Sequence, residues 1–272
     1  MRQKVNEVRG WDAAMADLLG TGDPTPPSDA AAFLDGMSVL DIGCGGGILT
    51  ESVARLGARV TGVDASKENI RIASLHTSGE PGGFAHPPTY RHATAETLRD
   101  EGQQFDVVTA MEVVEHVNDP AAFLRCLSEL VRPGGHLFLS TMSRTALSYL
   151  LTIFLAEDVL RVVSPGTHRH DQYINPDEMA QFFRTLGWIR DDDAMLAQRT
   201  KLPSGAPPAP IPPRLQFESR GTMYLPPLRR WILMPPSVAD AQARGERGPW
   251  MGGQRWSELC NYFFWVRRPE GA

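Results

Sequence analysis

Short apolar runs alternate with amphipathic stretches along the first half of the chain. Runs that are rich in β-branched residues predict β-strands, and apolar positions spaced three or four apart predict helices. The predicted strands are Ser38–Ile42, Ala58–Val63, Thr89–Ala93, Phe105–Ala110 and His136–Thr141, with an aromatic-rich strand at Tyr262–Val266 near the end. The predicted helices are Ile48–Leu56, Lys67–His76 with Ser66 as N-cap, and a helix from Asp119-Pro120 to Val131.

This alternation indicates βαβ units. We therefore expect an α/β fold with a doubly wound, mostly parallel sheet of seven strands, formed as a single domain over residues 1–272. Such sheets bind their ligands at the carboxyl ends of the strands, so the candidate site residues are expected there.

Two regions break the alternation. Residues 143–175 form a predicted apolar helical insertion after the fifth strand, and no charged residue occurs over 145–156. This stretch is either a helix buried in the core or a segment that leans into a membrane surface. Residues 200–258 are rich in Pro and Gly and predict irregular structure, with 203–213 as an extended or mobile linker.

Composition narrows the class of protein. Hydrophobic residues make up 42% of the chain and charged residues 22%, as in ordinary globular proteins. The net charge of −5 provides no basic field for nucleic acid. Three widely spaced cysteines form neither a disulfide framework nor a zinc pattern. No apolar stretch is long enough to span a bilayer, and the first residues lack the apolar core of a signal peptide.

A glycine loop joins the first predicted strand to the first helix. Gly43, Gly45 and Gly47 allow close approach of the backbone to a ligand, and Asp64 ends the next strand, within reach of ribose hydroxyls. A dinucleotide fingerprint requires Gly or Ala where Ile48 stands, which disfavours an NAD-binding module. The loop therefore favours an adenosine ligand such as S-adenosylmethionine, and a turn made only for packing is the alternative.

An acidic cluster follows the fourth predicted strand. Glu112, Glu115 and His116 stand at i, i+3 and i+4, which places them on one face of a helical turn. Such side chains suit Mg²⁺, Mn²⁺ or Zn²⁺, and a metal there would lower the pKa of a phenol. Two alternatives stay open: His116 acts as general base with Glu115 orienting it, or the acids only favour a solvated helix start.

Several motifs together resemble one family. VLDIGCGGG, FDVVTAMEVVEHV and LVRPGGHLFLST are similar to the motifs of S-adenosylmethionine-dependent methyltransferases, with their Rossmann-like fold. The further segment GTHRHDQYINPDEM (166–179) is more distinctive, and with it the chain closely resembles the ubiquinone-biosynthesis O-methyltransferase family over about residues 5–268. Weaker matches are VNEVR, GTMYLPP and NYFFWVRR.

The resemblance implies methylation of phenolic hydroxyls on polyprenylated rings, with S-adenosylmethionine as cofactor and a divalent ion, Mg²⁺ or another, on a Glu-x-x-Glu-His motif. Carried over, the motif gives Glu112, Glu115 and His116 as metal ligands, and His116 and Glu115 as catalytic residues. The expected cofactor contacts are Arg9, Gly43, Gly45, Asp64 and Met111, with Arg9 pairing the methionine carboxylate. The chain departs from the family in lacking an aromatic-rich segment before VNEVR and in a longer stretch at 228–258.

The expected partners are the prenylated phenol, a membrane surface bound peripherally, and other ubiquinone-biosynthesis proteins, with no nucleic acid. The resemblance implies the matrix side of the mitochondrial inner membrane in a eukaryote, and otherwise the bacterial cytoplasm or inner-membrane surface. Two other functions stay open: a metal-free small-molecule methyltransferase with His116 as base, and a cofactor-binding scaffold subunit. The polar residues His168, His170 and Asp171 indicate a loop over the substrate or, alternatively, a second metal site.

Overall fold

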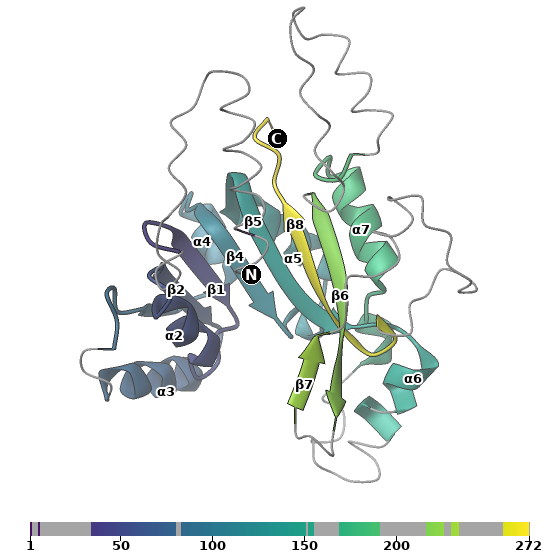
Figure 1. Ribbon diagram of the computed structural model, residues 1–272, viewed down its shortest axis with the longest axis horizontal. Helices are drawn as coiled ribbons and strands as arrows, with labels where there is room; N and C mark the ends of the chain where they lie inside the picture. The colour runs from purple at the N-terminus through teal and green to yellow at the C-terminus, as the bar shows by residue number, and fades with distance from the viewer. Residues whose placement is uncertain are drawn as a thin grey trace, which may run out of the picture.

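The computed structural model describes residues 1, 5, 34–79, 83–150, 152–154, 169–190, 216–225, 230–233 and 258–271. Within them, eight strands form one sheet in the order β3-β2-β1-β4-β5-β8-β6-β7 (Figure 1). The strands are β1 (Ser38–Ile42), β2 (Arg59–Asp64), β3 (Thr89–His92), β4 (Phe105–Met111), β5 (Val131–Met142), β6 (Phe217–Leu225), β7 (Arg230–Leu233) and β8 (Asn261–Arg267).

The first five strands pair in parallel, as the alternating pattern predicts. The remaining pairs, β5 with β8, β8 with β6 and β6 with β7, are antiparallel. The α/β fold with a mostly parallel sheet is therefore confirmed. The number of strands is corrected, because the described residues form eight strands where seven were expected.

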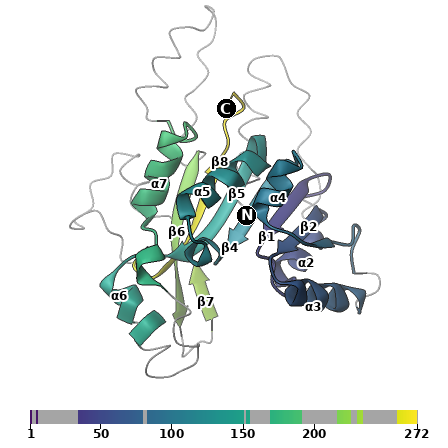
Figure 2. The same cartoon turned by 180° about the vertical axis from the view of Figure 1, so that it is seen from behind.

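Helices cover both faces of the sheet and connect its parallel strands. They are α2 (Ile48–Ala54), α3 (Lys67–Ser78), α4 (Ala95–Asp100), α5 (Pro120–Leu130), α6 (Ala146–Ser148) and α7 (Pro176–Thr185). Figure 2 shows α4, α5 and α7 lying together in front of the sheet. The expected N-cap of α3 is present, because the Ser66 hydroxyl accepts a hydrogen bond from the Asn69 N–H at 3.3 Å.

The core lies on the two faces of the sheet. On one face, strand residues such as Leu40 and Leu139 pack against apolar side chains from α4, α5 and α7, among them Leu98 and Phe183. On the opposite face, Val39, Val107, Phe138 and Trp265 pack against α2 and the fully buried Val5. Because the core fills both faces, the carboxyl ends of the strands are left for a ligand.

One sequence prediction needs correction here. Residues 200–258 are not irregular throughout, because they contribute β6, which pairs with β8 and β7, and β7, which pairs with β6 at the end of the sheet. In the 143–175 insertion, α6 continues in π-helical form at residues 149–150 and 152–154, and residues 155–168 lie outside the described residues. Arg9, His168, the linker at 203–213 and residues 155–163 of the apolar stretch lie outside the described residues.

No helix in the described ranges has the length and apolar character needed to cross a bilayer.

Candidate active site

The glycine loop has a backbone that ordinary residues rarely adopt. Gly43 and Gly47 have φ of 68° and 85°, in the left-handed region. A Cβ on Gly47 would lie 2.5 Å from the Tyr90 hydroxyl oxygen, and a Cβ on Gly43 would lie 2.5 Å from Val113 Cγ2. The loop is therefore fitted closely to β3 on one side and to the turn after β4 on the other. Glycine at these two positions is required by packing as well as by conformation.

Asp64 fastens this loop to the start of α3. Its Oδ2 accepts a hydrogen bond from the Gly45 N–H at 2.9 Å, and its Oδ1 accepts from the Ser66 N–H at 2.7 Å and from Asn69 Nδ2 at 3.2 Å. The carboxylate lies at the carboxyl end of β2 and is half-buried. This is the place expected for a ribose contact, and the structure adds a second role, which is to hold Gly45 in position.

A buried carboxylate beneath the loop was missed by the sequence reasoning. Asp41 is 3% exposed and accepts hydrogen bonds from the hydroxyls of Thr50 at 2.6 Å and Thr109 at 2.7 Å. Burial raises its pKa against the lowering effect of these two hydroxyls. Asp41 thereby ties β1 to α2 and β4 at the base of the glycine loop.

Glu112 lies at the carboxyl end of β4 in a strained conformation, with φ of 54°. Its N–H lies 3.0 Å from the Ser140 hydroxyl oxygen, and that hydroxyl donates back to Glu112 Oε1 at 2.6 Å. Asn261 Nδ2 donates to Glu112 Oε2 at 3.4 Å. These side chains come from three adjacent strands and fix the carboxylate at the edge of the sheet.

Glu115 is buried beside Glu112. It is 2% exposed, and its Oε2 accepts a hydrogen bond from Thr141 Oγ1 at 2.9 Å. Its Oε1 is buried and has no hydrogen-bond partner among the described residues. Burial, and then the negative charge of Glu112, raise the pKa of Glu115 to about 8. A buried carboxylate oxygen without a partner, next to a second carboxylate, is a donor set that suits a hard divalent cation.

The expected helical face for Glu112, Glu115 and His116 is not observed. Glu112 directly follows the last residue of β4, and only Val114–His116 form a 3-10 turn, labelled η1, in which Glu115 is buried and His116 exposed. In the part of the chain that the structure describes, no three His, Cys, Asp or Glu side chains converge as a metal site. The spacing argument fails because positive φ at Glu112 separates that residue from the turn.

The segment after the insertion packs against the same edge. Gln172 Nε2 donates to the Val117 carbonyl at 3.1 Å, and the Ile174 N–H donates to the Met142 carbonyl at 3.2 Å. A cavity of about 410 Å³ lies between this segment, α5 and α7, and Asn118, Gln172 and Phe182 are among the residues that line it. As predicted, a helix opens at Asn175-Pro176.

The polar residues of this segment have partners of their own. His170 Nε2 lies 3.0 Å from the Thr145 carbonyl oxygen, and Asp171 pairs with Arg169 at 2.7 Å. The first contact ties this segment to Thr145 at the start of α6, whereas the Arg169–Asp171 pair lies within the segment and is exposed.

The structure therefore brings together Gly43, Gly45, Asp64, Met111, Glu112 and Glu115 along the carboxyl edge, with His116 at its exposed rim. Sequence reasoning missed Ser140, Thr141 and Asn261. The signal for the first two was present, because hydroxyl residues follow the apolar run HLFL where a strand ends. Asn261 carried no such signal, since only the antiparallel pairing of β8 with β5 brings it to Glu112.

Comparison with known proteins gives the class to which this site belongs. Residues 24–189 match the family model described as a methyltransferase domain. The fold is similar to a crystal structure of an S-adenosylmethionine-dependent methyltransferase from Methanosarcina mazei, with a TM-score of 0.50 and 16% identity over 87% of this chain and 93% of that one. The matching family model, which agrees with this fold, thus identifies the chain as an S-adenosylmethionine-dependent methyltransferase.

Sequence relatives narrow this class. The chain is 40% identical over 241 residues to the mitochondrial ubiquinone biosynthesis O-methyltransferase of Schizosaccharomyces pombe, covering 87% of this chain and 71% of that protein. It is 49% identical over 160 residues to the ubiquinone biosynthesis O-methyltransferase of Ralstonia nicotianae, covering 58% of this chain and 65% of that protein. The chain belongs to the ubiquinone biosynthesis O-methyltransferase family.

Proposed function

We propose that the protein transfers the methyl group of S-adenosylmethionine to a phenolic hydroxyl of a polyprenylated ring in ubiquinone biosynthesis. The observation that carries this proposal is the direct packing of the glycine loop on the turn that bears the two carboxylates, through Gly43 and Val113. A donor held by the loop and an acceptor held at the carboxylates would thus be neighbours. The names of the relatives supply the substrate class.

On the donor side, we assign Gly43, Gly45, Asp64 and Met111 to the cofactor. Asp64 would accept hydrogen bonds from ribose hydroxyls while still holding Gly45, because each carboxylate oxygen has more than one lone pair. Met111 is the last residue of β4, and its side chain packs against the core cluster on the face of the sheet that α2 covers. Arg9, outside the described residues, is assigned to the methionine carboxylate.

On the acceptor side, the phenol must lose its proton so that its oxygen attacks the methyl carbon as the sulfonium loses its charge. Glu112, fixed by Ser140 and Asn261, and Glu115 with its unpartnered oxygen are positioned to receive that proton or to hold a cation. We assign Glu112, Glu115 and His116 as ligands of a divalent ion such as Mg²⁺, which would lower the pKa of the phenol. Exclusion of water and alignment of the two reactants would supply most of the rest of the acceleration.

The exposed position of His116 favours a second route. A histidine at the rim of the site, on a turn that does not align it with both carboxylates, is placed to act as a metal-free general base. The two routes share the donor site and differ only in what removes the proton.

Labelled S-adenosylmethionine and a short-tailed dihydroxybenzoate test the proposal. Transfer of label to the ring oxygen is the expected result, and no transfer under any metal condition contradicts the proposed activity. Chelation with EDTA separates the two routes. Loss of transfer that Mg²⁺ restores, together with loss in Glu112→Gln, supports the metal route. Transfer that survives both EDTA and Glu112→Gln but is lost in His116→Ala supports the route in which His116 is the general base.

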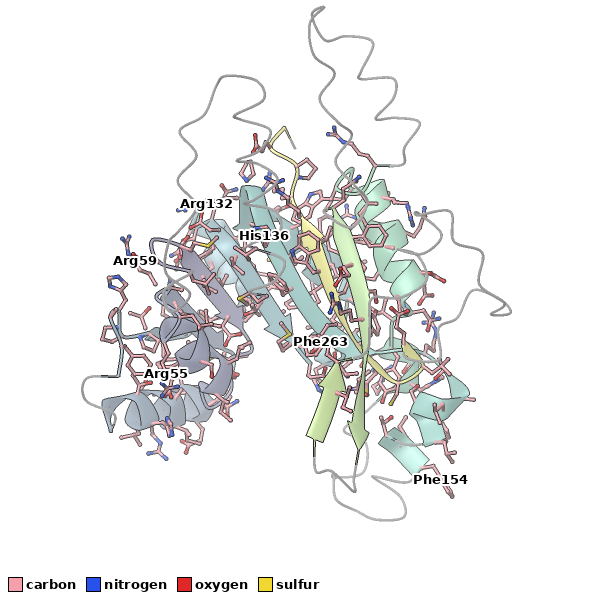
Figure 3. The ribbon with its side chains drawn as sticks, viewed as in Figure 1. Arg55, Arg59, Arg132, His136, Phe154 and Phe263 are labelled. Carbon is pink, nitrogen blue, oxygen red and sulfur yellow. The ribbon has the colours of Figure 1, made fainter. Side chains whose placement is uncertain are left out.

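We further propose that the protein binds a membrane surface peripherally, because its substrates carry polyprenyl tails. Exposed apolar side chains lie on α6 and its π-helical continuation, residues 146–150 and 152–154, which we call the α6 segment. Leu147, Tyr149, Leu150 and Phe154 are each 41–49% exposed. Figure 3 places Phe154 at the far end of that segment, away from the sheet. The location that follows is the matrix side of the mitochondrial inner membrane in a eukaryote and the inner-membrane surface in a bacterium, beside other proteins of the pathway.

A further inference from the structure

Phe263 is an exposed phenyl ring on an interior strand. β8 lies between β5 and β6, and the residues beside Phe263 are buried: Tyr262 and Phe264 are 1% exposed and Trp265 is 3% exposed. Phe263 is 42% exposed. Trp265, on the same face of the strand, is covered and packs near Phe138, with 6.4 Å between ring centroids. The folding of the sheet therefore explains the burial of Trp265 but gives no reason for an open ring two residues earlier.

The pairing of the strands places this ring in one cross-strand row with Met111 and Ser140, at the edge of the sheet that carries the candidate site. Met111 of β4 pairs with Ser140 of β5, and Ser140 pairs with Phe263 of β8. Residues paired in this way project from the same face of a sheet. Strands lie about 4.8 Å apart, so Met111 and Phe263 are separated by about 10 Å with Ser140 between them. Figure 3 shows Phe263 in the middle of the molecule, near the meeting point of β5, β6 and β8.

The carboxylate of Glu112 lies next to this row, because Glu112 directly follows Met111 at the end of β4. Ser140 donates to Glu112 at 2.6 Å, and Asn261, two residues before Phe263 on the same face, donates to Glu112 at 3.4 Å. An aromatic ring beside a hydrogen-bonded carboxylate suits a ligand that has an aromatic face and an ionisable hydroxyl. Offset or edge-to-face contact between two rings adds to affinity beyond the burial of area.

We infer that Phe263 is a wall of the acceptor pocket and stacks against the benzene ring of the phenolic substrate, holding its hydroxyl towards Glu112. This inference rests on the proposed function. It assigns the open ring to recognition of the aromatic head of the substrate, whereas the apolar side chains of α6 are assigned to the membrane. Phe263 is thus a residue that decides affinity for the acceptor and has no part in binding the donor.

Titration of the protein with a short-tailed dihydroxybenzoate in the presence of S-adenosylhomocysteine tests the inference by calorimetry. We expect Phe263→Ala to raise the Kd for the acceptor by about tenfold. Phe263→Tyr should stay near the wild-type value, and Phe263→Leu, which keeps apolar bulk without the ring, should fall between the two. The Kd for S-adenosylmethionine should be unchanged in all three variants.

Leu75→Ala is the control, because Leu75 is also a large apolar side chain, 59% exposed, and lies on α3, away from β8. It should bind the short-tailed acceptor as the wild type does. A Phe263→Ala protein that keeps the thermal midpoint and binds the acceptor within twofold of the wild type overturns the inference, and so does equal weakening in Phe263→Tyr and Phe263→Ala. If the wild-type protein neither binds nor methylates the acceptor, the proposed function fails and this inference fails with it.

Discussion

The Ser140 hydroxyl donates to Glu112 Oε1 at 2.6 Å while its oxygen lies 3.0 Å from the Glu112 N–H. One side chain thus fixes both the carboxylate and the backbone of a residue held at φ of 54°. We expect Ser140→Ala to lower kcat about tenfold or more, because Glu112 loses its orientation, and to cost about 1–2 kcal/mol of unfolding free energy. Steady-state kinetics and denaturant unfolding measure the two effects. Ser74→Ala on the exposed face of α3 should change neither, and an unaltered kcat in Ser140→Ala would remove Ser140 from the site.

Gly43→Ala tests the contact between the glycine loop and Val113. The new Cβ would lie 2.5 Å from Val113 Cγ2, at φ of 68°. Gly36 is the matched control, because its φ is 78° and a Cβ there meets nothing within 4 Å. Both variants carry the cost of left-handed backbone, about 1–2 kcal/mol. Gly43→Ala should lose a further ~1–3 kcal/mol from overpacking, together with affinity for S-adenosylmethionine.

Adding Val113→Ala to Gly43→Ala removes the methyl group that clashes. In denaturant unfolding, Gly43→Ala should be less stable than Gly36→Ala, and the double variant should recover most of that difference in unfolding free energy. If Gly43→Ala and Gly36→Ala are destabilised equally, the close packing of the loop on the turn is refuted.

Asp64→Asn tests whether this carboxylate organises the donor site. The amide offers one oxygen where the carboxylate accepts hydrogen bonds from Gly45, Ser66 and Asn69 through two. We expect the Kd for S-adenosylmethionine to rise about tenfold or more, since hydrogen bonds to charged groups contribute about 1.5–3 kcal/mol. Calorimetric titration with S-adenosylmethionine measures this Kd. Glu68→Gln, in the exposed first turn of α3, should bind as the wild type does, and equal Kd values for the two variants would exclude Asp64 from the donor site.

The lowered pKa of Asp106 predicts that the protein loses stability in acid. Burial raises the pKa of this carboxyl, but hydrogen bonds from the N–H and hydroxyl of Ser38 and from Arg132 outweigh it, so the folded pKa lies below the ordinary value. A lowered folded pKa contributes stability above about pH 4, which is lost as the pH falls through the folded pKa. Unfolding free energy measured from pH 6 down to pH 3 should therefore fall less steeply in Asp106→Asn than in the wild type, with Arg132→Ala between them. Parallel curves would show that Asp106 has no such role.

The membrane surface proposed on α6 is tested with liposomes. Leu150 and Phe154 are 49% and 48% exposed, and burial of such side chains contributes roughly 1.5–3 kcal/mol each. Leu150→Glu with Phe154→Glu should abolish co-sedimentation with anionic liposomes and leave the Kd for S-adenosylmethionine unchanged. Leu75→Glu with Ser78→Glu adds the same charge on α3 and should still sediment. Unchanged sedimentation of the α6 variant would contradict the proposal.

The order of the five parallel strands along the chain, the glycine loop and the position of Asp64 were determined by the sequence alone. Local physics is enough for these features, because apolar periodicity, Ser66 as N-cap and glycines between a strand and a helix all act over a few residues. The strand predicted at Tyr262–Val266 was found at Asn261–Arg267 for the same reason.

Tertiary structure alone decided the chemistry at the edge of the sheet. The spacing of Glu112, Glu115 and His116 predicted one helical face, but positive φ at Glu112 and the burial of Glu115 against Thr141 separate them. β6 and β7 lie in a stretch whose composition predicted no strands, and they form because β8 offers an unpaired edge. Asn261 and Phe263 reach Glu112 and Ser140 only because strands far apart in the chain pair in one register, and such long-range pairing has no local signal.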